Sequence, residues 1–476
     1  MTGVSGREIV NAETVLALGV IAALLLGKRR HNGAARPAST GNDALAVVSV
    51  VVVIVAAYWP ALRMPFVSDD YVIANLTRLF SGNYSIVFAR GGGDGFFRPI
   101  GFISLAWTWP WAGLDPVRWR AVALVLHCMN SALVYVLARS IGVARPWAWF
   151  AGALFAVHGA HPEAVAWIAG RFDVLAAFFS LIGLLAFIRL CKTGALMWGI
   201  AGGITVTAGI LSKESAYAVP LMMAVYAVSE PNFRKRGAKL LAPYFLLATA
   251  LFACRWTLQG GMGGYSGMFA FHPLSFANAL LLRLWAILFF PVNWPANVNA
   301  ALMIATIAGA GAWIALAWRQ SGSRAQLLLP LGFTLAAAIP PVGQLLIGAD
   351  LEKSRVLYLP SAGFCLFAAA AAQMAAPKIR MIAAVAILAF QAVALRHNLT
   401  IWENVAEKSK AVCHAAIACS NPESAAGLPR TIDGVYFFAN GFPECVRFEQ
   451  VQHPEIPTHA CSLAWDAQSL ELRDQK

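Results

Sequence analysis

Residues 44–62 read ALAVVSVVVVIVAAYWPAL and contain no charged side chain. A helix needs about 20 mostly apolar residues to cross the core of a bilayer, so this stretch predicts a transmembrane span. The same character runs through the chain, because 59% of its 476 residues are hydrophobic and only 12% are charged. Soluble domains carry about 25% charged residues. The composition therefore excludes a soluble globular protein, a disordered chain and a collagen-like fibre, and it predicts an integral membrane protein.

Twelve stretches of this kind predict an all-α polytopic bundle of about 12 transmembrane helices. The stretch nearest the N-terminus is short, but its basic residues follow the apolar run, which favours a span over a cleaved signal. A further apolar stretch, 277–293, is interrupted by Pro291 and followed by Pro295, so we expect a re-entrant or interfacial helix there. The predicted spans are 14–26, 44–62, 119–141, 146–160, 173–190, 195–211, 214–229, 240–258, 299–318, 326–347, 356–375 and 379–396.

Lys and Arg are distributed unevenly between the two sides of these spans. Six loops that alternate on one side hold 16 of the 36 Lys and Arg residues, but only two of the 23 Asp and Glu residues. Cytoplasmic loops retain Lys and Arg, so we expect this side to face the cytoplasm. The asymmetry also explains the net charge of +13, so binding to nucleic acid is not needed to account for that charge. The six loops are 27–43, 139–145, 189–194, 230–239, 319–325 and 376–380.

The chain divides into three predicted parts. Residues 1–43 form an additional N-terminal helix and a basic cytoplasmic loop, and residues 44–396 form the transmembrane module, with long outer loops at 63–118 and 255–298. Residues 397–476 form an extracytoplasmic tail. An even number of cysteines in an exported segment predicts up to two disulfides, with three possible pairings, whereas a cytosolic tail would hold free thiols. The tail cysteines are Cys413, Cys419, Cys445 and Cys461.

Ionisable side chains gather at the predicted outer ends of the spans, where placement near lipid is costly and therefore informative. Asp69 and Asp70 follow the span at 44–62. Adjacent carboxylates can supply a general base or hold a metal ion, and the alternatives are a solvated pair or a helix cap. Further along, Pro99 is expected to begin a helix, and Arg98 either binds a phosphate through its planar group or anchors the chain at the interface.

The next outer connections carry further candidates. His161 and Glu163, together with His158, suggest zinc, but their spacing lacks the usual metallohydrolase frame, so a metal ligand set stays unknown and substrate positioning is the favoured role. Arg355 and Tyr358 are three residues apart and share one face of a helix. The charged candidates together predict a basic pocket for a lipid-linked phosphate, with ordinary surface ion pairing as the alternative. The candidates for substrate binding are Arg98, His161, Glu163, Arg171, Asp173, Lys213, Glu214, Arg355 and Tyr358.

Five strings occur in order over residues 55–365: DD, FFRPI, HPEAVAWIAGRFDVLAAFF, SKES and EKSRVLYLPSAGF. This ordered set resembles the GT-C superfamily of integral membrane glycosyltransferases, and in particular bacterial relatives of the transmembrane-and-TPR (TMTC-type) protein O-mannosyltransferases. The resemblance implies a GT-C-like fold and a sugar donor linked to a lipid phosphate. It also implies that Asp69 is the catalytic base with Asp70 as its partner, that Arg171 and Asp173 shape the site, and that Arg355 lies near the donor phosphate.

The sequence therefore predicts a glycosyltransferase that moves a sugar from a polyprenyl phosphate to an acceptor hydroxyl, with inversion. We expect it in the inner (plasma) membrane, with the active site and tail on the periplasmic side. No cofactor is required, although a divalent metal stays open. The eukaryotic members carry TPR repeats where this chain has its tail, so the acceptor (glycan, lipid or protein) also stays open. The alternatives are a ligase using a lipid-pyrophosphate glycan and a polytopic transporter or flippase, although transporters usually show inverted repeats and midplane sites.

Overall fold

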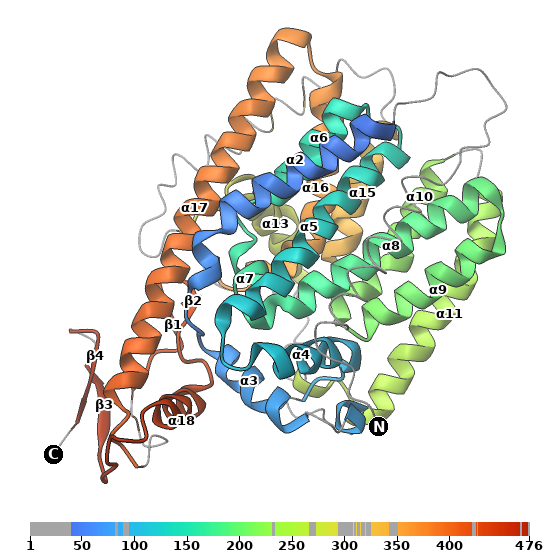
Figure 1. Ribbon diagram of the computed structural model, residues 1–476. Coiled ribbons are helices and arrows are strands. Elements are labelled where there is room, and N and C mark those ends of the chain that lie inside the picture. The colour runs from blue at the N-terminus through green and yellow to red at the C-terminus, as the bar shows by residue number, and fades with distance from the viewer. Residues whose placement is uncertain are drawn as a thin grey trace.

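The computed structural model is a helical bundle with four short strands in its C-terminal part (Figure 1). It describes residues 40–80, 84–88, 95–230, 234–265, 273–293, 325–341, 351–420, 427–466 and 469–474, with the single positions 308, 311, 315, 319 and 425. The predicted span at 14–26 and nearly all of the one at 299–318 lie outside the described residues, as do the basic residues Lys28, Arg29 and Arg30.

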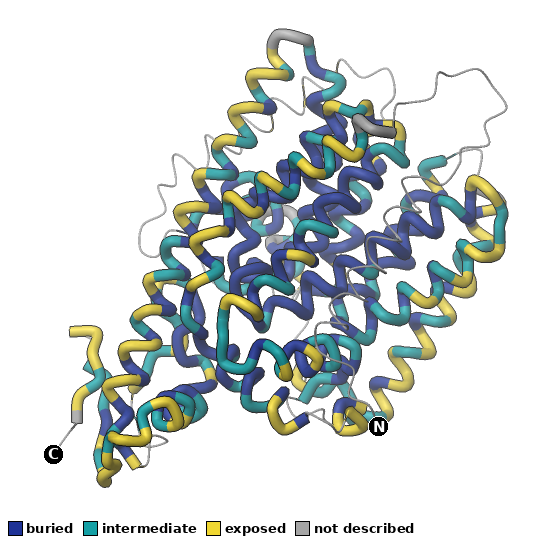
Figure 2. Tube along the Cα trace, viewed as in Figure 1, coloured by how far each residue is buried: buried dark blue, intermediate teal, exposed yellow. Residues whose placement is uncertain are grey.

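The centre of the bundle consists of helices that are buried along most of their length (Figure 2). Inside a membrane a helix satisfies its own backbone groups, which makes it the natural element for these apolar segments. Small residues bring neighbouring helices close: a Cβ on Gly363 would lie 2.5 Å from the backbone nitrogen of Thr334 on the next helix. The central helices are α5 (Pro116–Ser140), α6 (Arg145–Ala156), α8 (Arg171–Thr193), α15 (Ala325–Ala338) and α16 (Tyr358–Met374).

The outer helices expose large apolar side chains, which suits a surface that faces lipid tails. Exposed examples are Val52, Ile200, Leu246 and Ile382, one from each of four outer helices. The helices around the centre are α2 (Thr40–Tyr58), α9 (Leu196–Ile210), α10 (Val219–Ser229), α11 (Arg234–Gln259) and α17 (Pro377–Ala415).

Five described helical segments are long and apolar enough to cross a membrane. The prediction of a multi-pass helical membrane protein is therefore confirmed, while the number of twelve spans stays a prediction. The five segments are Pro116–Ser140, Ile168–Thr193, Arg236–Gln259, Ser354–Met374 and Ile379–Ala415, and the shorter apolar helices are Asp43–Tyr58, Leu196–Ile210 and Gln326–Ala338.

Three expected spans differ from the observed elements. The stretch at 146–160 contains the 12-residue α6, and the one at 214–229 begins as a 3₁₀ turn before α10. The last span was expected to end at 396, but α17 continues to Ala415 as one helix of 39 residues. The stretch at 277–293 is broken as expected: α12 (Pro273–Asn278), a π-helical turn and α13 (Leu284–Phe289) follow one another, and the helix stops before Pro291.

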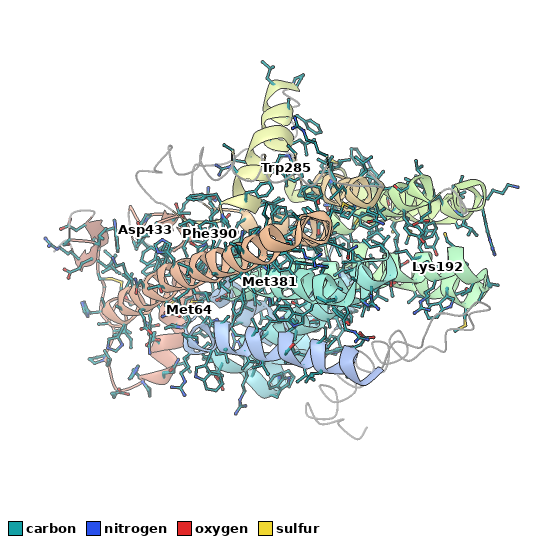
Figure 3. All side chains as sticks on the ribbon, turned by 90° about the horizontal axis from the view of Figure 1, so that it is seen from above. Met64, Lys192, Trp285, Met381, Phe390 and Asp433 are labelled. Carbon is teal, nitrogen blue, oxygen red and sulfur yellow. A yellow bond between two sulfur atoms is a disulfide. The ribbon has the colours of Figure 1, made fainter. Side chains whose placement is uncertain are left out.

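The two ends of the bundle carry different connections. At one end, Lys192 donates a hydrogen bond to the carbonyl of Ser140 (2.6 Å), and the backbone N–H of Ala144 donates to the side chain of Gln373 (2.7 Å). Two basic loops and the end of α16 therefore lie together, and Figure 3 shows Lys192 at the opposite end of the molecule from Asp433. The other end holds the short helices α3 (Asp69–Phe80), α4 (Pro99–Ala112) and α7 (Pro162–Val165), within segments expected to be outer loops.

The tail packs on this second end and is closed by disulfides. Its elements are β1 (Thr431–Ile432), β2 (Val435–Tyr436), α18 (Phe442–Gln452), β3 (Leu463–Asp466) and β4 (Glu471–Asp474), and the strands pair as two antiparallel hairpins. Cys413 bonds Cys445, and Cys419 bonds Cys461, with Cα–Cα distances of 5.9 and 5.5 Å. The tail therefore forms two disulfides, the largest number predicted, and the structure selects one of the three pairings.

The Cys413–Cys445 disulfide ties α18 to the end of α17, and we expect its removal to destabilise the tail. The double variant Cys413→Ser/Cys445→Ser should lose about 2–4 kcal/mol, because the reduced chain regains the freedom of a loop that the bond closes. Thermal unfolding of the detergent-solubilised protein, followed by tryptophan fluorescence, measures the change. The matched control is Cys254→Ser, an exposed free cysteine. An unfolding midpoint equal to that of the control would mean that packing alone holds α18.

Candidate active site

Asp69 and Asp70 both begin α3, but the two carboxylates occupy different surroundings. Asp70 is buried and accepts hydrogen bonds from the backbone N–H groups of Val67 (3.2 Å) and Ile168 (3.0 Å). The guanidinium of Arg120 lies 3.7 Å from it. Burial raises the pKa of Asp70 to about 7, although Arg120 opposes the shift. Asp70 therefore joins α3 to α5 and the turn before α8, while Asp69 is left facing a cavity.

A residue from the tail contacts Asp69. The side-chain amide of Asn440 donates a hydrogen bond to Oδ1 of Asp69 at 2.9 Å, across 371 positions of sequence. The neighbouring Gly441 has φ +89°, and a Cβ there would lie 2.4 Å from the carbonyl oxygen of Ser68. Only glycine permits this backbone conformation together with so close an approach. The start of α18 thus packs directly against the residue that precedes Asp69.

The cavity in front of Asp69 has a volume of about 270 Å³ and a mixed basic and aromatic lining. Four cationic side chains and one carboxylate line it, so the described lining has a net positive charge, which favours an anionic ligand. The charged lining residues are Asp69, Arg98, Lys213, Lys353 and Arg355, the aromatic ones are Phe96, Phe102, Trp167 and Phe172, and Asn440 completes the polar groups.

Arg98 is positioned by an ion pair and by aromatic stacking. It occupies the residue position immediately before α4, which begins at Pro99 as predicted. Its guanidinium donates to Glu214 from Nη2 (2.9 Å) and Nε (3.1 Å), and it lies 4.2 Å from the ring centre of Phe96. A planar guanidinium held in this way keeps a fixed orientation at the cavity wall. Glu214 therefore positions Arg98 without lining the cavity itself.

Lys213 and Asp173 form a second buried pair. Nζ of Lys213 donates a hydrogen bond to Oδ2 of Asp173 at 2.5 Å, and Lys213 reaches the cavity. Burial lowers the pKa of Lys213 to about 8, although the carboxylate of Asp173 opposes the shift. The charge of this lysine is therefore lost at a lower pH than that of a lysine in water.

Arg355 is held by Glu163 and two aromatic rings. Glu163 is buried and accepts hydrogen bonds from the Arg355 guanidinium, from the Arg355 backbone N–H (3.3 Å) and from the hydroxyl of Ser354 (3.1 Å). Burial raises the pKa of Glu163, while Arg355 acts in the opposite direction. The guanidinium lies 4.9 Å from the ring centre of Trp167 and 5.4 Å from that of Tyr436. Arg355 is thus fixed from three sides while it lines the cavity.

Seven of the eleven predicted site residues do not line the cavity, and three of these seven form hydrogen bonds inside the bundle. Arg171 donates hydrogen bonds to Thr108 (2.6 Å) and to the carbonyl of Trp119 (2.8 Å). His161 lies 2.8 Å from the hydroxyl of Ser361. Arg171 therefore joins α8 to α4 and α5. His161 joins the turn before α7 to α16.

Tyr358 is the third of these residues. Its hydroxyl lies 2.7 Å from Nδ1 of His127 and accepts a hydrogen bond from Asn130 (3.1 Å). His127 is fully buried in this network. Arg355 and Tyr358 belong to one continuous helical segment, but their side chains have different partners: Glu163 for Arg355, and His127 and Asn130 for Tyr358.

The cavity also contains residues that the sequence did not single out as site residues. Trp167, which lines the cavity, stacks on Tyr436 with ring centres 4.9 Å apart, and the Arg355 guanidinium lies against both rings. Lys353 adopts φ +65° immediately before the 3₁₀ turn and turns into the cavity. The crowding of charge around position 353 was a usable signal. No sequence signal pointed to Asn440 or Tyr436, because both lie in the tail, far from every motif.

A zinc site at His158, His161 and Glu163 is not formed by the described residues. Nε2 of His158 lies 3.2 Å from the carbonyl of Leu288, and Glu163 is occupied by Arg355. In the part of the chain that the structure describes, one group of three side chains has the spacing of metal ligands, and it lies in the tail at His414, Glu449 and His453.

The protein is thus a multi-pass membrane protein with a basic, aromatic-lined cavity at one end of its helix bundle, and a carboxylate faces that cavity.

Comparison with known proteins identifies protein O-mannosyl-transferases among the sequence relatives. The chain is 26% identical to protein O-mannosyl-transferase Tmtc1 of Drosophila melanogaster over 59% of this chain and 38% of that protein. It is 30% identical to protein O-mannosyl-transferase tmtc2 of Xenopus laevis over 31% of this chain and 18% of that protein, and 26% identical to TMTC4 of Mus musculus over 53% and 44%. No family model matches the chain.

These matches confirm the resemblance to the TMTC-type O-mannosyltransferases. The chain spans less than half the length of the curated relatives it matches. Among solved structures, ArnT from Cupriavidus metallidurans bound to undecaprenyl phosphate aligns with a TM-score of 0.48 and 12% identity, over 91% of this chain and 94% of that chain.

Proposed function

We propose that this chain is a glycosyltransferase that moves a sugar from a polyprenyl phosphate to an acceptor hydroxyl on the non-cytoplasmic side of the membrane, with inversion. The observation that carries the proposal is the Asp69 carboxylate facing a cavity lined by four cations. A base and a cluster of cations in one cavity are what this chemistry needs. The sequence relatives are named protein O-mannosyl-transferases, so mannose and a protein hydroxyl are the first donor and acceptor to test.

The proposed reaction assigns a role to each side chain. Asp69 takes the proton of the acceptor hydroxyl, whose oxygen attacks the anomeric carbon on the face opposite the phosphate. The bond between that carbon and the phosphate oxygen breaks, and the lipid phosphate leaves with the electron pair. Negative charge then grows on the phosphate, where fixed cations stabilise it best. Arg98, Lys213 and Arg355 are the cations with observed carboxylate partners that hold them in place.

The orientation in the membrane follows the charge of the loops. Lys192 and the loop at 139–145 lie at the end of the bundle away from the tail, and cytoplasmic loops retain basic residues. The cavity, next to the tail, then faces the periplasm. The two tail disulfides support this side, because disulfides persist in oxidising compartments.

A direct assay tests the donor class. Purified protein in nanodiscs is incubated with polyprenyl-phosphate mannose and other polyprenyl-phosphate monosaccharides, together with cell-envelope extract as acceptor, and mass spectrometry follows the lipid and the product. Loss of one sugar from the lipid and its gain by the acceptor supports the proposal. Transfer of a whole glycan from a lipid pyrophosphate would establish a ligase instead. Lipid movement across the bilayer with no transfer would establish a flippase.

Donor binding is expected to weaken as the pH rises through about 8. Lys213 has a pKa of about 8, so it is charged below that pH and neutral above it, and the cavity then loses one of its four cations. The KM for the lipid-phosphate donor should therefore rise between about pH 7 and about pH 9. The variant Lys213→Arg keeps its charge throughout this range, so its KM should change less. Parallel pH profiles for both proteins would contradict a role for the lysine charge.

A further inference from the structure

Three metal-ligand side chains meet where α17 ends against α18, away from the cavity. His414 lies in the last turn of α17, Glu449 is on α18, and His453 is the residue that ends α18. Nδ1 of His414 is 3.6 Å from Oε2 of Glu449, and the two histidine rings have centres 5.5 Å apart. One ligand atom from each of the three residues lies within 4.8 Å of the other two.

The local structure holds these donors in place before any ion binds. Glu449 and His453 are four residues apart and therefore share one face of α18. Cys413, which precedes His414, is bonded to Cys445, one turn before Glu449. The disulfide thus fixes the two helices beside the cluster. It also consumes two thiols that would otherwise compete for a metal ion.

The donor set has the chemistry of a zinc site. Two imidazoles and a carboxylate are ligands that Zn²⁺ takes at about 2.0–2.2 Å, which places neighbouring ligand atoms about 3.4 Å apart in a tetrahedron. The observed 3.6 Å between His414 and Glu449 is close to that spacing. Glu455 accepts from Nδ1 of His453 at 3.2 Å. A carboxylate partner of this kind orients a metal-binding histidine and leaves Nε2 for the ion.

We propose that His414, Glu449 and His453 bind one Zn²⁺ ion, with water as the fourth ligand, and that the ion fastens α18 to α17. The site is structural and separate from the proposed transfer reaction. The site is nevertheless linked to the cavity through α18, because Gly441 at the start of α18 packs on Ser68, next to Asp69. An ion at one end of α18 would therefore stiffen the segment that carries Asn440 to Asp69.

The test uses the full chain in detergent, purified on a tag that contains no histidine. Bound metal is removed with a chelator, Zn²⁺ is returned in competition with a chromophoric chelator, and elemental mass spectrometry gives the zinc content after gel filtration. We expect one zinc per chain and a higher unfolding temperature with Zn²⁺ than without it. The double variant His414→Ala/His453→Ala should bind Zn²⁺ at least about tenfold more weakly and lose the thermal shift. The matched control, His459→Ala, changes another exposed tail histidine and should behave as wild type.

A folding check keeps the outcome clear. The double variant must elute as the wild type does and form both tail disulfides, and if it does not, Glu449→Gln replaces it as the test variant. Substoichiometric zinc in the wild-type protein would overturn the proposal. So would a double or Glu449→Gln variant that binds Zn²⁺ as tightly as the wild type. Neither result would decide whether the protein transfers sugar, because transfer is measured in a separate assay.

Discussion

Replacing Asp69 with asparagine is expected to lower sugar transfer by about 10²–10⁴-fold and to leave the protein folded. The substitution preserves the size of the side chain but removes the carboxylate that accepts a proton. Asp69 is only partly buried, and its carboxylate accepts a hydrogen bond from the neutral amide of Asn440, so its loss leaves no buried charge unpaired. The rate is measured by mass spectrometry at saturating donor, and folding by gel filtration and thermal unfolding.

The matched control for this prediction is Asp115→Asn. Asp115 caps the start of α5, accepting from the N–H of Val117 at 2.9 Å, and asparagine caps helices about as well. The control therefore makes the same chemical change in the same outer segment, away from the cavity lining, and should transfer sugar at the wild-type rate. If folded Asp69→Asn were as active as Asp115→Asn, Asp69 would not be the base.

Replacing Arg355 with glutamine is expected to damage both activity and stability. The cavity loses a cation that faces the proposed phosphate, which should lower turnover by about 10²–10³-fold. Glu163 is buried and would lose its ion-pair partner, which should cost about 3–5 kcal/mol of folding free energy. The two effects have different causes, so a second substitution can separate them.

The separating variant is Glu163→Gln/Arg355→Gln. It removes the unpaired buried charge as well, so it should recover much of the lost stability while transfer stays low. A pH series adds a second check. Burial already raises the pKa of Glu163, and loss of Arg355 raises it further, so the single variant should be least stable at high pH, where Glu163 must ionise. If the double variant recovered activity together with stability, Arg355 would have only a structural role.

The local pattern of the sequence predicted the class of protein and much of its helical frame. Mostly apolar stretches of about 20 residues were enough to place α5, α8, α11 and α16, because the lipid core imposes length and low polarity on any segment that crosses it. Pro99 marked the start of α4, and an even number of cysteines marked the disulfides of the tail. Each of these signals is local, so it can be read without knowing which segments pack together.

The tertiary structure decided which side chains face the cavity. Asp69 and Asp70 are neighbours of the same type, yet only packing against Ile168 and Arg120 separates the buried carboxylate from the accessible one. The partners Arg98–Glu214 and Glu163–Arg355 are 116 and 192 positions apart, and Asn440 reaches Asp69 across 371. The sequence by itself determined a membrane-spanning helical chain with charged outer segments, since hydrophobicity acts on each segment alone. The fold decided whether a charged side chain lines the cavity or only forms a structural ion pair. That outcome depends on contacts between distant segments, which no local sequence pattern records.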